Sequence, residues 1–297
     1  MIKIKSIFTC FISIMLVFGF SVLNYAQDPP ADRAEVPLTD PSKPSLVKIS
    51  VHQGEITVTG YNGKTIIVEA KIDAAYQESQ YLERAKERLK EQLKEKNKEK
   101  IKATEGMHVI KNNTTGLSVE EENNVVDVRV ASFSTKVDVN IKVPYKSSLK
   151  LKGFEAGKIK VENVDGELDV THHNEAITLK NVSGTVVAHT FNGDLTVSFD
   201  RVNLNKPMSF STFNGDIDVT FPKDAKFSLK LKTDQGEIYS DFKLEMRSTP
   251  SPENKPGRKD GKYAIKFDKT LYGLINGGGE EVQFKTFDGD IYIRAKK

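Results

Sequence analysis

The sequence has a single cysteine, Cys10, among its 297 residues. Cys10 lies in an N-terminal apolar run that we expect to be removed, and the residues around it do not form a lipoprotein signal. The mature chain would then contain no thiol. This excludes disulfide bonds, thiol catalysis and cysteine metal sites.

Excess charge of one sign is also missing. The formal net charge is +3, and removal of residues 1–26, which hold two lysines and no acidic residue, lowers it to +1. A near-neutral chain gives no support to nucleic-acid binding as a main task, so we predict no nucleic-acid partner.

Motifs of common enzymes are absent as well. The sequence contains no Gly-x-Ser-x-Gly, His-Glu-x-x-His or P-loop pattern. Its one close histidine pair, His172-His173, would face opposite sides of a strand, and filling a corner explains it better than a metal site. The Gly-Asp pairs are similar to calcium-binding nonapeptide repeats, but the second glycine and the matching aspartate are missing. We predict no catalytic residue, no metal and no cofactor.

The N-terminus has the pattern of a secretory signal peptide over residues 1–26. Lys3 and Lys5 precede an apolar run over residues 7–23, and cleavage is predicted between Ala26 and Gln27. An uncleaved anchor is the alternative, since the run is nearly long enough to span a bilayer. After cleavage we expect no membrane span and a protein in the periplasm, at the cell surface or secreted. Residues 27–44 contain five prolines and no periodicity, which predicts an extended linker.

An internal repeat predicts the fold. Five segments from Gly157 onward fall into register every nine residues, enough for one short strand and a turn. Two unlike corners alternate, because Asn163–Gly166 recurs eighteen residues later as Asn181–Gly184. One turn of such a coil cannot cover its own apolar edge, so turns must stack. Residues 45–297 therefore predict one all-β domain, a parallel β-helix or β-solenoid with about two strands per 18–22-residue turn.

The alternation within these strands predicts the core. Inward positions should be buried and the residues between them exposed. The predicted core includes Leu168, Val170, Ile177, Leu179, Leu195 and Val197.

The second corner recurs through the rest of the chain and carries an aromatic residue in several copies. The sequence Thr-Phe-Asn-Gly-Asp at 190–194 returns at 212–216 and, with Asp for Asn, at 286–290, while 233–237 is a weaker copy. Glycine suits the positive φ of a tight turn. Each Phe or His before it is expected to stack on its counterpart in the next turn.

These residues resemble a known family. The Gly-[Asp/Glu]-[Ile/Leu]-x-Val strands, the lead-in Ile141–Pro144 and the closing segment Phe284–Ile291 are similar to bacterial proteins of the DUF4097 β-strand-repeat family, which is described as adhesin-like. The resemblance covers roughly residues 45–73 and 125–295. It implies a parallel β-helix-like fold outside the cytoplasm, and it transfers no catalytic or binding residue.

One segment departs from the strand pattern. Residues 74–103 lack proline and glycine, and glutamates recur every four residues from 83 to 99, each with a lysine three places later. This predicts a charged α-helix at about 74–103 with a narrow apolar stripe. We interpret it as a surface helix lying on the solenoid, and a protruding arm that binds a partner is the alternative.

A binding face is predicted on the strands that follow the aromatic corners. Acidic residues beside exposed tyrosines suit carbohydrate hydroxyls or a basic protein. The predicted face consists of Asp194, Asp216, Asp218, Glu237, Tyr239, Asp290 and Tyr292.

The function predicted from the sequence is a non-enzymatic, exported adhesin or envelope-associated scaffold, whose partner is a glycan or an envelope protein. The alternative is a carbohydrate-active lyase or hydrolase on the same scaffold. Such chemistry needs positioned carboxylates, and Asp216 and Asp218, two residues apart on one strand, come nearest to such a pair.

Overall fold

The computed structural model describes residues 31–92, 114–132, 135–247, 257–259, 262–264 and 269–297. Apolar and polar residues alternate along much of the chain, and most of the described residues lie in β-strands. Twenty of these strands belong to one sheet. A small hairpin, β18 (Gly257–Lys259) and β19 (Lys262–Ala264), forms a separate sheet. The predicted all-β class is confirmed. The signal peptide and its cleavage site lie outside the described residues.

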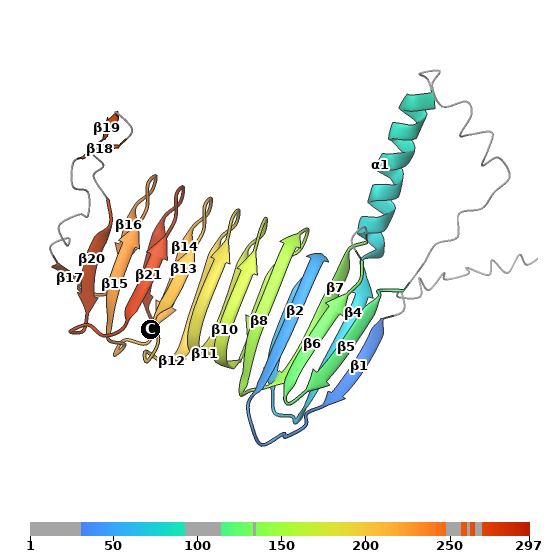
Figure 1. Ribbon diagram of the computed structural model, residues 1–297, viewed down its shortest axis with the longest axis horizontal. Coiled ribbons are helices and arrows are strands. Elements are labelled where there is room, and N and C mark those ends of the chain that lie inside the picture. The colour runs from blue at the N-terminus through green and yellow to red at the C-terminus, as the bar shows by residue number, and fades with distance from the viewer. Residues whose placement is uncertain (1–30, 93–113, 133–134, 248–256, 260–261, 265–268) are drawn as a thin grey trace, which may run out of the picture.

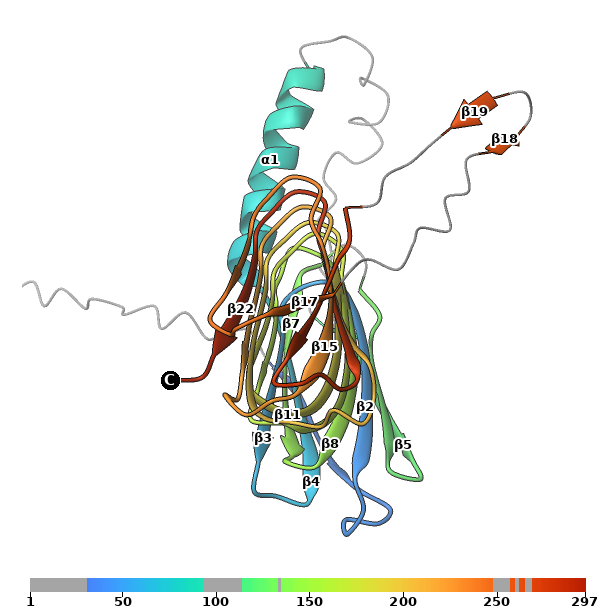
Figure 2. The ribbon, with the colours of Figure 1, turned by 90° about the vertical axis from the view of Figure 1, so that its left-hand side faces the viewer.

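The large sheet winds round into two layers joined at the corners (Figures 1 and 2). In ladder order the first layer contains β5 (Leu117–Glu122), β6 (Val125–Val130), β2 (Ser45–Gln53), β8 (Ser147–Glu155), β10 (Asp165–His172), the second half of β11 (Ile177–Thr190), β13 (Met208–Ser211), β21 (Glu281–Lys285), β15 (Phe227–Lys232), β20 (Leu271–Ile275) and β17 (Glu245–Arg247). The second contains β1 (Asp32–Pro37), β4 (Thr65–Ile72), β7 (Val137–Pro144), β3 (Ile56–Tyr61), β9 (Ile159–Glu162), the first half of β11, β12 (Leu195–Val202), β14 (Ile217–Phe221), β22 (Ile291–Ala295) and β16 (Ile238–Ser240).

The predicted register is confirmed in the middle of the sheet. Ile177 pairs in parallel with Ile159 on one side and with Leu195 on the other. Equivalent residues are therefore 18 positions apart, and 22 in the next turn, where Leu195 pairs with Ile217. All six predicted core residues are at most 2% exposed, and they belong to one continuous apolar cluster between the layers.

Both ends of the sheet depart from a purely parallel coil. At the N-terminal end, β4 pairs antiparallel with β1 and β7, and β5 with β6. At the C-terminal end, β20 pairs antiparallel with β15 and β17. The expectation of parallel pairing throughout is therefore wrong at the ends, where hairpins finish the two layers.

The order of the turns in space also differs from their order in the sequence. The C-terminal turn, β21 and β22, lies between β13 and β14 on one side and β15 and β16 on the other. Likewise β2 and β3 lie between β6 and β7 on one side and β8 and β9 on the other. Each end of the coil thus contains one turn inserted between two others.

The predicted linker over residues 27–44 is wrong at residues 32–37. Residues 32–37 form β1, whose six residues pair with β4 from Asp32 opposite Ala70 to Pro37 opposite Thr65. Proline is tolerated at Pro37 because β1 is an edge strand. Residues 27–30 lie outside the described part.

The inserted helix is confirmed as α1 (Ala74–Gln92), and its predicted remainder, residues 93–103, lies outside the described residues. Asp73 caps it: its Oδ1 accepts the Tyr76 N–H at 3.0 Å. Lys136 Nζ lies 2.8 Å from Asp73 Oδ2, and the Lys136 ammonium together with the Tyr76 N–H lowers the pKa of Asp73. In both views α1 projects beyond the sheet rather than lying on it, so our preferred interpretation is wrong (Figures 1 and 2). Leu82, a residue of its apolar stripe, is 52% exposed.

Within the described part of the chain, no helix is both long enough and apolar enough to cross a membrane.

Candidate functional site

The predicted acidic residues form a column that is held by the backbone of neighbouring turns. Asp194 Oδ1 accepts the Asp216 N–H at 3.0 Å, and Asp216 Oδ1 accepts the Asp290 N–H at 2.8 Å. Asp290 Oδ1 accepts the Glu237 N–H at 2.8 Å. Each of these bonds is charge-assisted, which offsets the repulsion between stacked carboxylates and fixes the acids in one row.

The two predicted tyrosines lie side by side at the end of this column. The Tyr239 and Tyr292 rings stack with centroids 5.1 Å apart and an angle of 9° between their planes. The Tyr292 hydroxyl donates to Asp290 Oδ2 at 3.0 Å, and this bond raises the pKa of Tyr292. Tyr239, on the last strand of the second layer, is 50% exposed. The pair therefore presents an aromatic surface next to the acids.

Asp218 completes the cluster through an arginine that sequence reasoning missed. Arg294 Nε donates to both carboxylate oxygens of Asp218, at 2.8 and 2.9 Å, and its guanidinium lies 5.0 Å from the centre of the Tyr292 ring. Asp216 and Asp218, the nearest approach to a catalytic pair, are thus both engaged with other groups of the protein. The signal was available, because Arg294 follows Tyr292 by two residues and so faces the same side.

The structure therefore brings all seven predicted residues together on the C-terminal part of the second layer. We call this cluster, with Arg294, the acid–tyrosine face. It combines carboxylate acceptors, a guanidinium and one open aromatic ring, groups that recognise hydroxyl-rich or basic partners.

The corners beside the acid–tyrosine face are built from one motif, in which each residue has a separate contact. The rings of His173, Phe191, Phe213 and Phe287 stack in that order with centroids 5.4, 4.9 and 4.8 Å apart, as predicted. The buried Thr212 hydroxyl donates to the Gly193 carbonyl at 3.1 Å. A Cβ on Gly215, at φ 142°, would lie 2.3 Å from that same oxygen. The motif thus rigidifies the edge from which the acids project.

The histidine pair divides between two roles. His173 stacks on Phe191, as a corner residue should. His172 instead takes the position of Thr190 in the next turn, and it is 1% exposed. Its Nδ1 accepts the N–H groups of Asn174 at 3.2 Å and Glu175 at 3.0 Å, while Nε2 has no partner. Among the described residues, no group of three or more His, Cys, Asp or Glu side chains could hold a metal ion.

Acidification is expected to destabilise the turn that holds His172. Burial lowers the pKa of His172 below its ordinary value of 6.5. Below about pH 6.5 the unfolded chain therefore binds a proton that the folded chain does not, and stability falls as the pH falls. Denaturant unfolding at pH 7.5 and pH 5 should show a smaller loss in His172→Asn, whose Oδ1 keeps an acceptor there. His173→Asn is the matched control, and it should lose as much stability between pH 7.5 and pH 5 as the wild-type protein. Equal losses in all three proteins would contradict this role.

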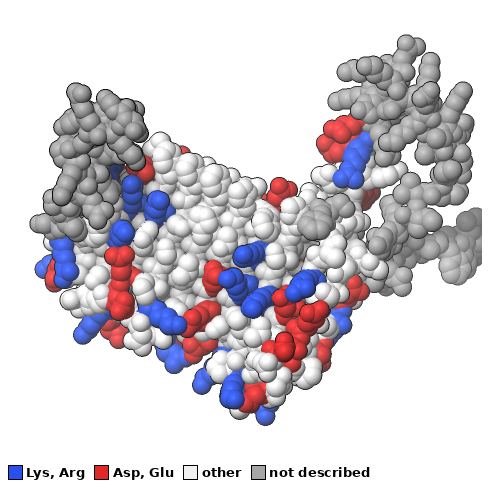
Figure 3. Space-filling view, viewed as in Figure 1, with Lys and Arg blue, Asp and Glu red and all other residues white. Residues whose placement is uncertain are grey.

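The outer surface of the first layer differs from the acid–tyrosine face in its distribution of charge. Figure 3 shows charges of both signs along the lower part of this layer and an uncharged area above them. No single sign dominates, so long-range steering of a charged partner is not expected from this side.

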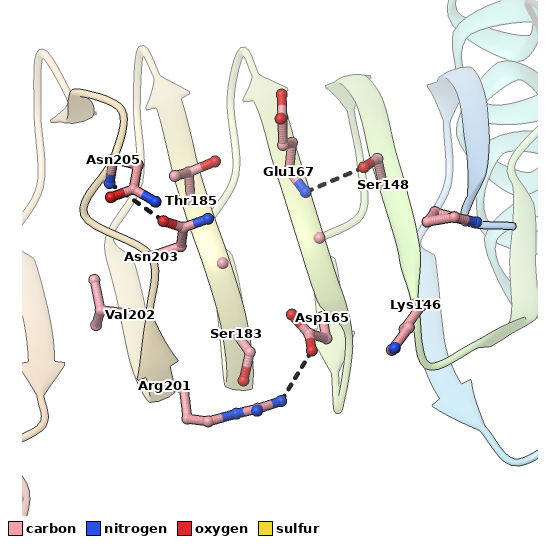
Figure 4. Close-up of a pocket in the computed structure, with 13 residues that line it drawn as sticks. Lys146, Ser148, Asp165, Glu167, Ser183, Thr185, Arg201, Val202, Asn203 and Asn205 are labelled. Carbon is pink, nitrogen blue, oxygen red and sulfur yellow. Dashed lines mark hydrogen bonds and ion pairs between the residues drawn. The ribbon is translucent and has the colours of Figure 1, made fainter.

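A groove that sequence reasoning missed lies at the other corner, the one formed by Asn163–Gly166 and Asn181–Gly184 (Figure 4). It has a volume of about 680 Å³ and crosses the starts of β8 and β10, the middle of β11 and the segment after β12. Its lining is polar and includes Ser148, Asp165, Glu167, Ser183, Thr185, Arg201, Asn203 and Asn205.

Comparison with known proteins gives one family and one distant structure. A family model for Toastrack DUF4097 matches residues 147–294. No curated protein matches the chain. The crystal structure of a candidate cell adhesion protein from Clostridium sporogenes ATCC 15579 is similar, with 13% identity and a TM-score of 0.45, over 91% of this chain and 100% of that one. A likeness this distant transfers no function. Through residues 147–294 the chain belongs to the Toastrack DUF4097 family.

Proposed function

We propose that this protein is an exported, non-enzymatic β-solenoid that serves as an adhesin-type or envelope-associated binding scaffold. The observation that carries the proposal is the acid–tyrosine face, where side chains from three neighbouring strands and from the corners before them meet on one surface. Backbone N–H groups hold the acids, and stacking holds the tyrosines. Such rigidity lowers the entropy cost of binding a partner.

The proposed partner is a glycan or a protein of the cell envelope. Carboxylates accept hydrogen bonds from sugar hydroxyls, and an exposed tyrosine ring offers an apolar surface with little conformational entropy to lose. The competing function is a carbohydrate-active enzyme. Depolymerisation of a bound polymer by the purified protein would support the enzyme, and unchanged polymer length would support the scaffold.

Loss of the two tyrosines is expected to weaken binding at least tenfold, because aromatic side chains that a partner covers contribute much of the binding energy of an interface. A glycan and protein array would first identify a ligand of the purified protein. The Tyr239→Ala, Tyr292→Ala double variant should then lose affinity for it. Tyr145→Ala is the matched control, since Tyr145 is 49% exposed against 50% for Tyr239.

Deletion of residues 80–100 tests whether the acid–tyrosine face or α1 binds the ligand. The deletion should leave affinity unchanged if the acid–tyrosine face binds the ligand. If the deletion abolishes binding while the double tyrosine variant keeps it, the projecting helix is the binding element and the face is not.

Export is part of the same proposal, supported by Lys3, Lys5 and the apolar run before Ala26. Mass spectrometry of the protein from its native host should find a mature N-terminus at Gln27. An intact Met1 in the cytosolic fraction would overturn export.

A further inference from the structure

The polar groove at the asparagine corner has a regular floor. In the parallel ladder Asp165 lies beside Ser183, and Ser183 beside Arg201. Two residues further along the same strands, Glu167 lies beside Thr185. Neighbouring strands are about 4.8 Å apart, so the groove from β8 to the segment after β12 is about 14 Å long. A trough of this length suits an extended ligand rather than a single small one.

Two solvent-exposed ion pairs run along the groove. Arg201 reaches past Ser183 to Asp165, with 2.9 Å between its Nη2 and Asp165 Oδ2 (Figure 4). Lys206 bonds to Glu167 in the same way from the segment after β12. These pairs link positions 36 and 39 residues apart. They connect the end of β12 and the segment after it with β10, and because they are exposed each adds little stability.

Two hydroxyl groups lie on the floor of the groove. Ser183 is 6% and Thr185 is 8% exposed, and both line the groove. Neither hydroxyl is among the side-chain atoms of the described residues that are fully buried without a partner, and both residues line the open groove, where water reaches them. A ligand hydroxyl binds there by replacing that water as the hydrogen-bond partner of Ser183 or Thr185.

The rest of the lining identifies the chemistry of such a ligand. The amides of Asn203 and Asn205 offer donors and acceptors, and the Asn205 N–H already donates to Asn203 Oδ1 at 3.2 Å. The charges of the lining cancel, because Lys146 and Arg201 balance Asp165 and Glu167. Only Pro44 and Val202 are apolar. Phosphate-rich polymers and apolar peptides therefore both fit poorly.

We propose that this groove binds a neutral oligosaccharide through Ser183, Thr185 and the two asparagines. Sugar hydroxyls are donors and acceptors at once, so they match the hydroxyls of Ser183 and Thr185 and the amides of the two asparagines. With no aromatic ring in the lining, binding rests on hydrogen bonds and is of millimolar to micromolar strength. The site lies at the opposite corner from the acid–tyrosine face and stands independently of the scaffold function proposed above.

Calorimetric titration of the purified protein with tetrasaccharides of glucose, galactose and N-acetylglucosamine tests the proposal, with galacturonate tetrasaccharide as the anionic counterpart. At least one neutral tetrasaccharide should bind saturably. The Ser183→Ala, Thr185→Val double variant, which nearly keeps side-chain volume, should bind it at least tenfold more weakly. Thr196→Val removes an exposed hydroxyl from β12 in the second layer and should change nothing.

Two further measurements keep the test independent of folding and of the other site. Chemical-shift mapping on the unmodified protein should place the changes at Ser183, Thr185 and Asn203. The Tyr239→Ala, Tyr292→Ala variant should bind the tetrasaccharide with unchanged affinity. Saturable binding by none of the neutral sugars, tighter binding of the galacturonate, or retained affinity in the hydroxyl variant would each overturn the proposal.

Discussion

Replacing Leu179 with aspartate is expected to unfold the middle of the sheet. Leu179 is fully buried, and its ladder neighbours Val161 and Val197 are at most 1% exposed. Losing a buried leucine costs about 2–5 kcal/mol, and a buried carboxylate without a partner adds several more. The total stability of a domain is only about 5–15 kcal/mol. The variant should therefore be largely unfolded.

Thr178→Asp is the matched control for this experiment. It introduces the same carboxylate one residue earlier on β11, on the opposite side of the strand, where Lys160 is a ladder neighbour. Thermal melting followed by circular dichroism should show a transition close to that of the parent protein for Thr178→Asp and none for Leu179→Asp. A soluble Leu179→Asp protein with an unchanged melting temperature would refute the register of the core.

The core was predictable because strand alternation and the repeat length constrain each other. A slip of one residue would move Leu179 to the solvent side, and an eighteen-residue turn sets it beside Val161 and Val197 without gaps. The stacking of Phe191 on Phe213 was predictable for the same reason, since identical motifs occupy identical corners.

The order of the turns was not predicted, because it depends on long-range pairing between segments far apart in the sequence. A signal was nonetheless present. Phe213 and Phe287 belong to nearly identical motifs and stack directly. The two corners are far apart in the sequence: Thr286 of one donates to Gly215 of the other across 71 residues. The copy with Asp234 in place of the aromatic residue lies beyond Phe287, at the end of the stack, where a ring would have one neighbour only.

The two candidate sites differ in how far sequence could reveal them. The acid–tyrosine face was predictable, because its residues hold the same positions relative to one repeated motif. The groove at Ser183 was not, because Arg201 reaches Asp165 two turns away. Such a bridge depends on the ladder and on the course of the segment after β12.

Removal of the C-terminal turn tests the inserted order of the strands. Truncation after Glu280 deletes β21 and β22, which pair with strands on both sides in both layers. In a coil stacked in sequence order, the loss of the last turn would only shorten the protein. In this structure it leaves the facing edges of four strands unpaired and opens the core between them.

The expected result of that truncation is an unfolded or aggregated protein. It removes Val282, Phe284, Ile291 and Ile293, all at most 1% exposed, each of which contributes about 1.5–3 kcal/mol by burial. Their sum is comparable to the stability of a whole domain, and the exposed strand edges favour aggregation. The control is removal of Lys297 alone, an exposed residue outside β22, which should leave melting unchanged. A truncated protein that stays soluble and melts cooperatively within a few degrees of the full chain would show that the last turn lies at the end of the coil and not inside it.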